Sequence, residues 1–393
     1  MSKRFLITIF TLLFIVVAGG IAIYLAKGYT FNVKDKTIAG TGIITITSVP
    51  DAASVYLDGH LTTATNATIS SLSPAEYTVK VVKEGFIPWE KKVKVNVGLV
   101  TDLKVTLFPA IPTVYPLTFT GVDKPILSPD GGKLAYIVPK NATDSGANKK
   151  AGVWVWSMTS DKPIAFARGA EPHQIADNRS IDYSTAILKW SSDSTQVLAN
   201  IGNNNYLLQD SQLNTDPRDI TPTLTATLKS WEDDLKVSQS ARFLNIKNLA
   251  KRQEASNAGV IRWSPDETKI MYAGNKTSAQ PDKTNNTKAD SQTTQAAEDS
   301  LSFKVYDILT NLEYEIPQAK YHYWLPDSRH LVLVDEGAIA VADFDGTNKA
   351  IIYVGNFDVG SVFIWPDSSR LAIVSSIPTP TASAPNLYGI NLK

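Results

Sequence analysis

The stretch VIRWSPDETKIMYAG, residues 260–274, decides the fold because near-copies of it recur along the C-terminal part of the chain. Each copy has an apolar run, a polar turn that usually contains Pro and Asp, and a second apolar run. Pro fixes φ in such a turn, and Asp can bond the backbone two residues on. Each copy therefore predicts a β-hairpin. Aligned on their Asp, the copies are ILSPDGGKLAYIV (Asp130), LKWSSDSTQVLANI (Asp193), IRWSPDETKIMYAG (Asp266), YWLPDSRHLVLV (Asp327) and FIWPDSSRLAIV (Asp367).

Further apolar segments follow these hairpins and predict a third and a fourth strand for most units. Four strands in a repeat of about 40 residues are typical of a β-propeller blade, which cannot bury both of its faces alone. The last two turn aspartates are 40 residues apart, whereas the earlier spacings of 63, 73 and 61 require insertions. The pattern predicts a propeller over residues 111–393 with five blades, and a degenerate sixth blade remains open near residues 170–186. The third strands are GVWVWSM, NYLLQD, SFKVYDI, AIAVADFD and NLYGINL, and the fourth strands include PIAFA, LEYEIP and AIIYVG.

The insertions are of two kinds. Residues 140–150 and 275–300 are polar tracts almost without large apolar residues, and this composition predicts disordered loops. The segment 223–258 instead has apolar residues at helical spacing, which predicts one or two helices with the apolar face packed on the propeller. A partner-binding helix is the alternative. The spaced residues are Leu224, Leu228, Trp231, Leu235, Phe243, Ile246, Leu249 and Ala250.

The two ends of the repeat region complement each other. The last unit stops at NLYGINLK without a fourth strand, while TVYPLTF, residues 113–119, precedes the first unit as an orphan strand. Pairing the two would close the ring and remove exposed edges. The hairpin set, over about residues 113–393, resembles TolB-like propellers, whose repeats carry a similar aromatic-Ser-Pro-Asp-Gly signature. In that family the signature holds the fold, so the resemblance implies no catalytic residue.

Residues 42–110 alternate as short strands and predict a small antiparallel β sandwich, with a hairpin turn at Asp58-Gly59. The segment resembles the PEGA domain, although Asp51, Ala52 and Ala75 depart from its pattern at turns. The resemblance implies an envelope-associated module without established chemistry. It rests on Pro50-Asp51-Ala52-Ala53, Val55-Tyr56-Leu57-Asp58-Gly59, Leu72-Ser73-Pro74, Tyr77-Thr78-Val79, Gly85-Phe86 and Trp89.

The N-terminus predicts a membrane anchor. From Phe5 to Ala26 the chain has 22 residues without a charge, which at about 1.5 Å each span roughly 33 Å, enough for a hydrocarbon core of about 30 Å. A cleaved signal peptide is the alternative, but its apolar region is shorter and ends in a small-x-small site. Lys3 and Arg4 favour a cytoplasmic N-terminus with the bulk of the chain extracytoplasmic. The predicted parts are a single-pass anchor at 1–27 and a stalk at 28–41.

Composition removes several classes of function. Lys plus Arg and Asp plus Glu both number 38, so no basic surplus is present to neutralise nucleic-acid phosphates. The chain has no cysteine, which excludes disulfides, thiol catalysis and cysteine-bound zinc. The four histidines have no metal-ligand spacing and are predicted to be structural or on the surface. They are His60, His173, His322 and His330.

No motif for catalysis, a metal or a cofactor is found. The five turn aspartates are predicted to be copies of one turn residue rather than ligands of one cation. The carboxylate pairs Asp233-Asp234 and Asp335-Glu336 leave a glycosidase open. Trp154, Trp156, Trp324 and Trp365 are expected to pack between sheets, with a sugar-stacking platform as the alternative. Asn66, Asn141, Asn275 and Asn285 begin Asn-x-Thr strings that matter only in a host that glycosylates them.

These observations predict an all-β protein with an N-terminal transmembrane helix, a PEGA-like sandwich and a propeller of five to six four-stranded blades with a helical insertion. The expected function is non-catalytic binding of an envelope protein or wall polymer outside the membrane. The alternative is a carbohydrate-active hydrolase that uses carboxylates in the propeller funnel. Facing buried carboxylates would favour the hydrolase, whereas aromatic and neutral polar groups would favour binding. A sensor is disfavoured because only Met1 to Arg4 would remain inside.

Overall fold

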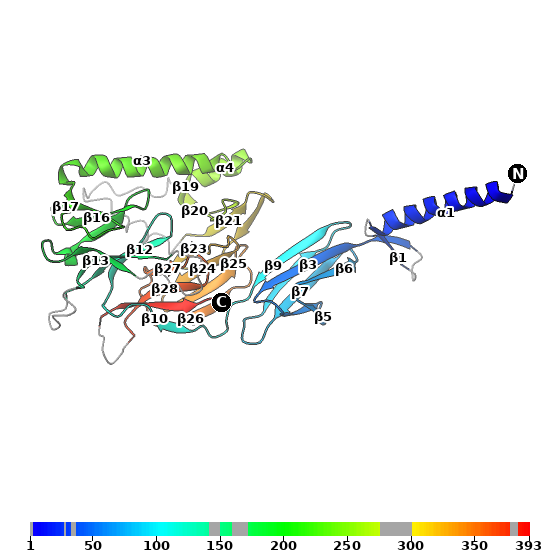
Figure 1. Ribbon diagram of the computed structural model, residues 1–393, viewed down its shortest axis with the longest axis horizontal. Coiled ribbons are helices and arrows are strands. Elements are labelled where there is room, and N and C mark those ends of the chain that lie inside the picture. The colour runs from blue at the N-terminus through cyan, green and yellow to red at the C-terminus, as the bar shows by residue number, and fades with distance from the viewer. Residues whose placement is uncertain are drawn as a thin grey trace. The chain divides into compact units, whose positions relative to one another are not determined.

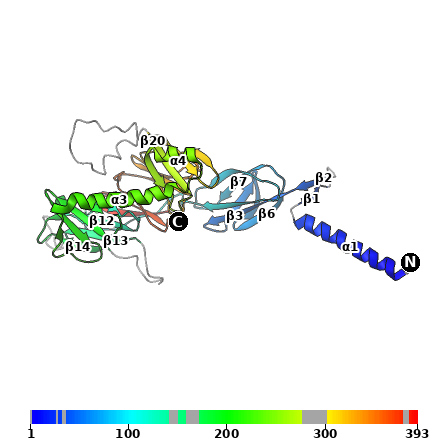
Figure 2. The same cartoon turned by 90° about the horizontal axis from the view of Figure 1, so that it is seen from above.

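The computed structural model of the protein describes residues 3–26, 29–32, 37–140, 150–158, 172–275, 301–377 and 384–393. The chain divides into two units, Met1–Ile111 with Lys393 and Pro112–Leu392, which Figures 1 and 2 colour from blue to red along the chain. Most of both polar tracts, Asn141 and Asn285, and the PIAFA segment lie outside the described residues.

The first unit begins with helix α1, Lys3–Ala26, followed by the paired strands β1, Tyr29–Asn32, and β2, Thr37–Gly40. The segment predicted as a stalk therefore includes a short hairpin. Side chains 7–23 of α1 are exposed. Within the described part of the chain, no helix meets both the length and the hydropathy required of a membrane span.

Two sheets form the rest of this unit, and their facing sides share an apolar core that includes Ile44, Ile46, Val79 and Val81. One pairing differs from the predicted antiparallel sandwich, because β3 and β9 run parallel. Parallel neighbours need a long crossover, and here the crossover contains the whole second sheet together with β6 of the first. The first sheet has the order β6-β3-β9, with β3 Gly42–Val49, β6 Ala67–Leu72 and β9 Val100–Thr106; the second has the order β5-β4-β7-β8, with β4 Ser54–Leu57, β5 His60–Ala64, β7 Glu76–Val82 and β8 Trp89–Lys94.

The second unit consists of five four-stranded antiparallel sheets, which we call blades 1 to 5. Each begins with the hairpin around a turn aspartate. Blade 1 contains β11 Asp123–Leu127, β12 Lys133–Val138, β13 Gly152–Ser157 and β14 His173–Asp177; blade 2 contains β15 Ile187–Trp190, β16 Gln196–Ile201, β17 Asn204–Gln209 and β18 Arg218–Asp219; blade 3 contains β19 Ala258–Trp263, β20 Lys269–Asn275, β21 Phe303–Asp307 and β22 Leu312–Glu315; blade 4 contains β23 Tyr321–Trp324, β24 His330–Asp335, β25 Ala338–Asp343 and β26 Ala350–Val354; blade 5 contains β27 Val362–Ile364, β28 Arg370–Ser375, β29 Asn386–Asn391 and β10 Val114–Pro116.

Strands from both ends of the repeat region complete blade 5, as the orphan strand predicts. Strand β10 pairs antiparallel with β29, with Val114 opposite Ile390 and Pro116 opposite Tyr388. The region near residues 170–186 contains β14 of blade 1 and a 3-10 turn at Tyr183–Thr185 rather than a sixth sheet. The described propeller therefore has five blades.

Two helices lie between blades 2 and 3: α3, Leu224–Phe243, and α4, Leu249–Ser256. Figures 1 and 2 show α3 extending from the blade 2 strands to α4 beside blade 3. The packing of α3 is shallower than the helical spacing predicts, because none of its residues is buried and Leu235 is exposed; Leu249, the first residue of α4, is exposed as well. The described contacts of α3 with the blades include polar ones to the turn residues Ser192 and Glu267 and an apolar one from Phe243 at its C-terminal end.

Candidate functional site

The repeated turn has the same construction in every blade. The residue after the Asp has a left-handed backbone, with φ of +72° at Gly131 and between +57° and +59° at the other four positions. The Asp carboxylate accepts a hydrogen bond from the main-chain N–H two residues on. These N–H to Oδ1 pairs are Gly132–Asp130 (2.9 Å), Thr195–Asp193 (3.1 Å), Thr268–Asp266 (3.0 Å), Arg329–Asp327 (2.9 Å) and Ser369–Asp367 (2.8 Å).

Hydrogen bonds lower the pKa of four of the turn aspartates, Asp130, Asp193, Asp266 and Asp327. Burial by itself would raise the pKa of Asp130 and Asp266, but hydrogen bonds from Ser128 and Ser264 and from the turn backbone lower it overall. At Asp193 the Ser191 hydroxyl is the main cause of a lowered pKa. Each aspartate thus stabilises its own turn, in agreement with the interpretation of five copies of a turn residue.

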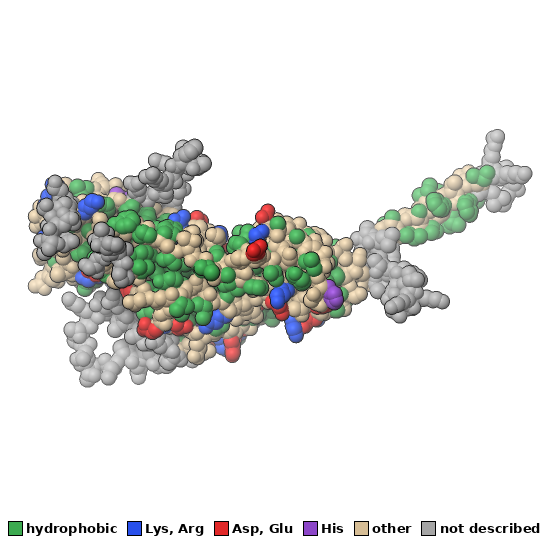
Figure 3. Space-filling model, turned by 90° about the horizontal axis from the view of Figure 1, so that it is seen from below, with side chains coloured by type: hydrophobic (Ala, Val, Ile, Leu, Met, Phe, Trp, Pro, Cys, Tyr) green, Lys and Arg blue, Asp and Glu red, His purple; other side chains and the backbone are tan. Residues whose placement is uncertain are grey.

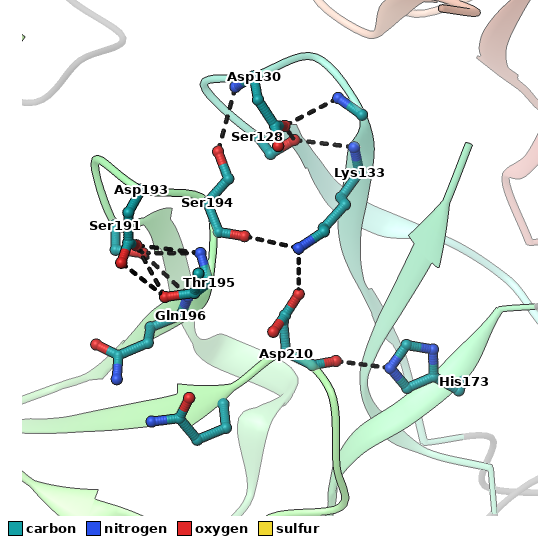
Figure 4. Close-up of polar contacts among 12 residues, drawn as sticks. Ser128, Asp130, Lys133, His173, Ser191, Asp193, Ser194, Thr195, Gln196 and Asp210 are labelled. Atoms are coloured by element: carbon teal, nitrogen blue, oxygen red, sulfur yellow. Dashed lines mark hydrogen bonds and ion pairs between the residues drawn. The ribbon is translucent and has the colours of Figure 1, made fainter. Parts of the chain in front are cut away.

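Two blade junctions share a pair of hydrogen bonds. Between blades 1 and 2, the Asp130 N–H donates to Ser194 Oγ at 3.2 Å, and Trp190 Nε1 donates to the Ile126 carbonyl at 3.2 Å. Lys133 adds bonds to the Ser194 carbonyl and to Asp210, as Figure 4 shows. Between blades 3 and 4 the equivalent bonds join Asp266 N–H to Ser328 Oγ (3.0 Å) and Trp324 Nε1 to the Arg262 carbonyl (3.1 Å).

The first strands of all five blades line one cavity of about 1390 Å³. The wall is mixed and somewhat more apolar than polar, with prolines from four of the five repeated turns and several aromatic rings. Lys124 and Arg262 supply cationic groups, and Thr185 and Ser361 supply hydroxyls. The prolines are Pro129, Pro265, Pro326 and Pro366, and the aromatic residues are Trp263, Tyr323, Trp324 and Phe363.

Three aspartates also line the cavity, and each has a partner. Asp130 is held in its turn. Asp358 accepts bonds from the Ser361 hydroxyl at 2.5 Å and the Gly360 N–H at 3.1 Å, and Asp123 lies 4.0 Å from the Lys124 ammonium. A glycosidase acid needs a raised pKa, whereas the pKa of Asp130 is lowered.

The carboxylate pairs noted in the sequence lie elsewhere. Asp233 and Asp234 are on α3, where Asp234 accepts a bond from the Ser192 hydroxyl. Asp335 accepts a bond from the Lys320 N–H, and Glu336 pairs with the Lys320 ammonium at 2.6 Å. Neither pair lines the cavity.

The histidines contact backbone or carboxylate groups of the fold. His60 is exposed at its hairpin, and His173 bonds the Asp210 carbonyl at 2.6 Å. His322 is fully buried against Phe303, and this burial lowers its pKa to about 4. His330 contacts Asp327 at 2.6 Å through Nδ1. Across the described residues, no group of three or more His, Asp or Glu side chains is arranged to hold a metal ion.

The tryptophans divide between sheet packing and the cavity wall. Trp156 packs edge-to-face on Trp365 between blades 1 and 5, with centroids 5.5 Å apart, and Trp154 Nε1 donates to the Lys150 carbonyl. Trp324 and Trp263 line the cavity. The sequence analysis did not identify Arg262, Trp263 and the four turn prolines as residues that line a cavity. The available signal was their position just before a turn aspartate.

The comparison with protein families identifies the small β unit. Residues 41–111 match the PEGA domain. The match confirms the resemblance that the turn and strand motifs of this segment indicate. No curated protein matches the chain significantly.

TolB proteins are among the solved structures that match the chain. The chain spans 60% of the first of these structures. The TM-scores of the structures named below are low, so the propeller assignment rests on the sheet topology. The matches include TolB from Acinetobacter baumannii (13% identity, 81% of this chain and 60% of that one, TM-score 0.22), a putative TolB from Agrobacterium tumefaciens (14%, 67% and 76%, 0.21) and an oligogalacturonate lyase in complex with manganese (12%, 80% and 74%, 0.23).

Proposed function

We propose that the protein is a non-catalytic, membrane-anchored envelope protein whose extracytoplasmic propeller binds a protein or wall-polymer partner in its central cavity. The carrying observation is the cavity of about 1390 Å³, whose wall combines aromatic rings and prolines with polar and charged groups. Small-molecule pockets usually measure about 300–1,000 Å³. A larger cavity suits a segment of a longer chain.

The lining chemistry supports binding over hydrolysis. Indole, phenol and proline faces offer flat apolar surface to an extended protein segment or to sugar rings. The three lining aspartates are held by serine, backbone or lysine partners. Hydrophobic side chains also gather over a broad area of the propeller face in Figure 3.

Anchoring is supported by the uncharged run Phe5–Ala26. In α1 the described large apolar side chains are exposed, with Phe10 at 70% and Phe14 at 66%. Contact between apolar surface of this extent and water is unfavourable, and insertion of the helix into a bilayer removes this free-energy cost. In the order of the chain, the PEGA unit lies between the anchor helix and the propeller. The bulk of the protein is then extracytoplasmic.

The test is a binding comparison with the full chain in detergent. Purified, protein-free cell-wall material is sedimented with the wild type and with Tyr323→Ala, which removes a ring from the cavity wall. Tyr353→Ala, on the outer strand of the same blade, is the matched control. We expect saturable binding that falls at least 10-fold in Tyr323→Ala alone.

If wall material binds neither protein, cross-linking in intact envelopes tests the protein partner with the same two variants. Equal cross-linking yields for Tyr323→Ala and Tyr353→Ala would contradict a role for the cavity. Recovery of the chain in the soluble fraction of lysed cells would contradict the anchor.

A further inference from the structure

The junction between blades 2 and 3 lacks the bonds found at the two junctions described above. Blade 3 carries Glu267 at the position where blades 2 and 4 carry Ser194 and Ser328, so the bonding hydroxyl is missing. Trp263 occupies the position of Trp190 and Trp324. Its Nε1 is buried without a hydrogen-bond partner in the described structure.

Helix α3 contacts the turns on both sides of this junction. On blade 2, Asp234 accepts a bond of 3.1 Å from the Ser192 hydroxyl. On blade 3, Arg242 Nε lies 2.9 Å from Glu267 Oε1. The Phe243 ring packs edge-on against Trp263 with centroids 5.4 Å apart. The helix therefore bridges two turns that lack their own direct bonds.

The contacts that hold α3 are weak. None of its 20 residues is buried, and its N-cap residue Thr223 makes no side-chain capping bond. The Arg242–Glu267 pair is 39% and 41% exposed, and exposed pairs contribute little to stability. Few buried contacts permit local opening without global unfolding. By contrast, α4 buries Ala255 and pairs Lys251 with Glu313 on blade 3.

We propose that α3 is a detachable strap, a helix that can dock on and leave the seam between blades 2 and 3. The seam is the junction where α3 contacts Ser192 of blade 2 and Glu267 of blade 3. When the strap is docked, Asp234 and Arg242 hold the two turns in place. When it detaches, blades 2 and 3 are free to separate. Trp263 links this motion to the cavity, because it lines the cavity and also packs on Phe243 of the strap. The proposal does not depend on what the cavity binds.

Hydrogen exchange of the full chain, followed by mass spectrometry of peptides, tests the proposal. We expect the α3 amides to exchange at least 10-fold faster than those of β16 and β20, the second strands of blades 2 and 3. In the double variant Asp234→Ala/Arg242→Ala, exchange should also rise at least 10-fold in β19. Blade 1 strands β12 and β13 serve as the internal control and should not change.

A cysteine pair gives the reverse experiment, since the chain has no cysteine of its own. Ser192→Cys/Asp234→Cys, oxidised to a disulfide, should slow α3 exchange at least 10-fold, and reduction should restore it. The reduced form of the same variant is the matched control.

Three results would overturn the proposal. Exchange of α3 as slow as that of β16 and β20 would make the helix a permanent part of the fold. Release of α3 without any change in β19 would show that it does not close the seam. Failure of the folded double-cysteine variant to oxidise would contradict the docked contact.

Discussion

The Arg370 guanidinium donates a hydrogen bond of 2.8 Å to the Tyr115 hydroxyl, joining two residues 255 positions apart in the chain. Arg370 also lies over the Trp365 ring, 4.9 Å from its centroid. Tyr115 is on β10 and Arg370 on β28, so the bond lies in the blade that both ends of the propeller region complete. Closure is therefore stabilised by side chains as well as by strand pairing.

Tyr115→Phe should weaken this closure. The change removes the hydroxyl that accepts from Arg370 and leaves the ring in place. Hydrogen bonds to charged groups contribute about 1.5–3 kcal/mol, and the partial exposure of this one places the expected loss at the lower end. Urea unfolding measures it. Tyr353→Phe in blade 4 is the control, and an equal effect in both variants would contradict a specific role in closure.

Asp210→Ala should weaken the junction between blades 1 and 2. The Asp210 carboxylate accepts a bond of 2.5 Å from Lys133 of blade 1, and both side chains are largely buried, at 13% and 26% exposure. Removing one partner leaves a partly buried ammonium that has only the Ser194 carbonyl, so a loss of about 1.5–3 kcal/mol is expected. Thermal unfolding tests this against Asp216→Ala, an exposed carboxylate in the same segment. Unchanged stability of Asp210→Ala would show that the pair is energetically neutral.

Glu313 should make stability depend on pH below about 4.5. Burial alone would raise its pKa, but hydrogen bonds from Lys251, Lys304 and Tyr272 lower it to about 2 from an ordinary value of 4.5. A pKa lowered in the folded state adds stability that is present above the unfolded pKa and is lost as pH falls from about 4.5 towards 2. Glu313→Gln should flatten the pH dependence of unfolding in this window. A wild-type curve that Glu313→Gln leaves unchanged would contradict the assignment.

Gly131→Ala should destabilise the first repeated turn through the backbone alone. Gly131 has φ of +72°, and a Cβ built on it would meet no atom within 4 Å. A left-handed backbone costs a non-glycine residue about 1–2 kcal/mol, so a loss of about 1 kcal/mol is expected in chemical unfolding. Gly360→Ala is the control, since Gly360 has no left-handed φ. Equal losses in both variants would contradict a cost that comes from the left-handed backbone of Gly131.

The turn chemistry explains why so much of the propeller was predictable. Asp130, Asp193, Asp266, Asp327 and Asp367 bond within two residues of themselves, so the hairpins are visible in short windows of sequence. The pairing of β10 with β29 followed from counting strands. In contrast, Trp263 stands three residues before its turn aspartate, as Trp190 and Trp324 do, so its place in the hairpin does not predict a different environment. Its different environment comes from Phe243, on a helix whose position no local pattern specifies.

The sequence by itself determined the hairpin repeat, the PEGA-like segment and the closing strands, because alternation and turn preference act over a few neighbouring residues. Only the tertiary structure decided which residues face the cavity, which blade junctions carry hydrogen bonds and where α3 docks. Those features depend on the relative positions of side chains about 60 residues apart, such as Asp130 and Ser194. Packing of whole blades, rather than local propensity, sets such positions.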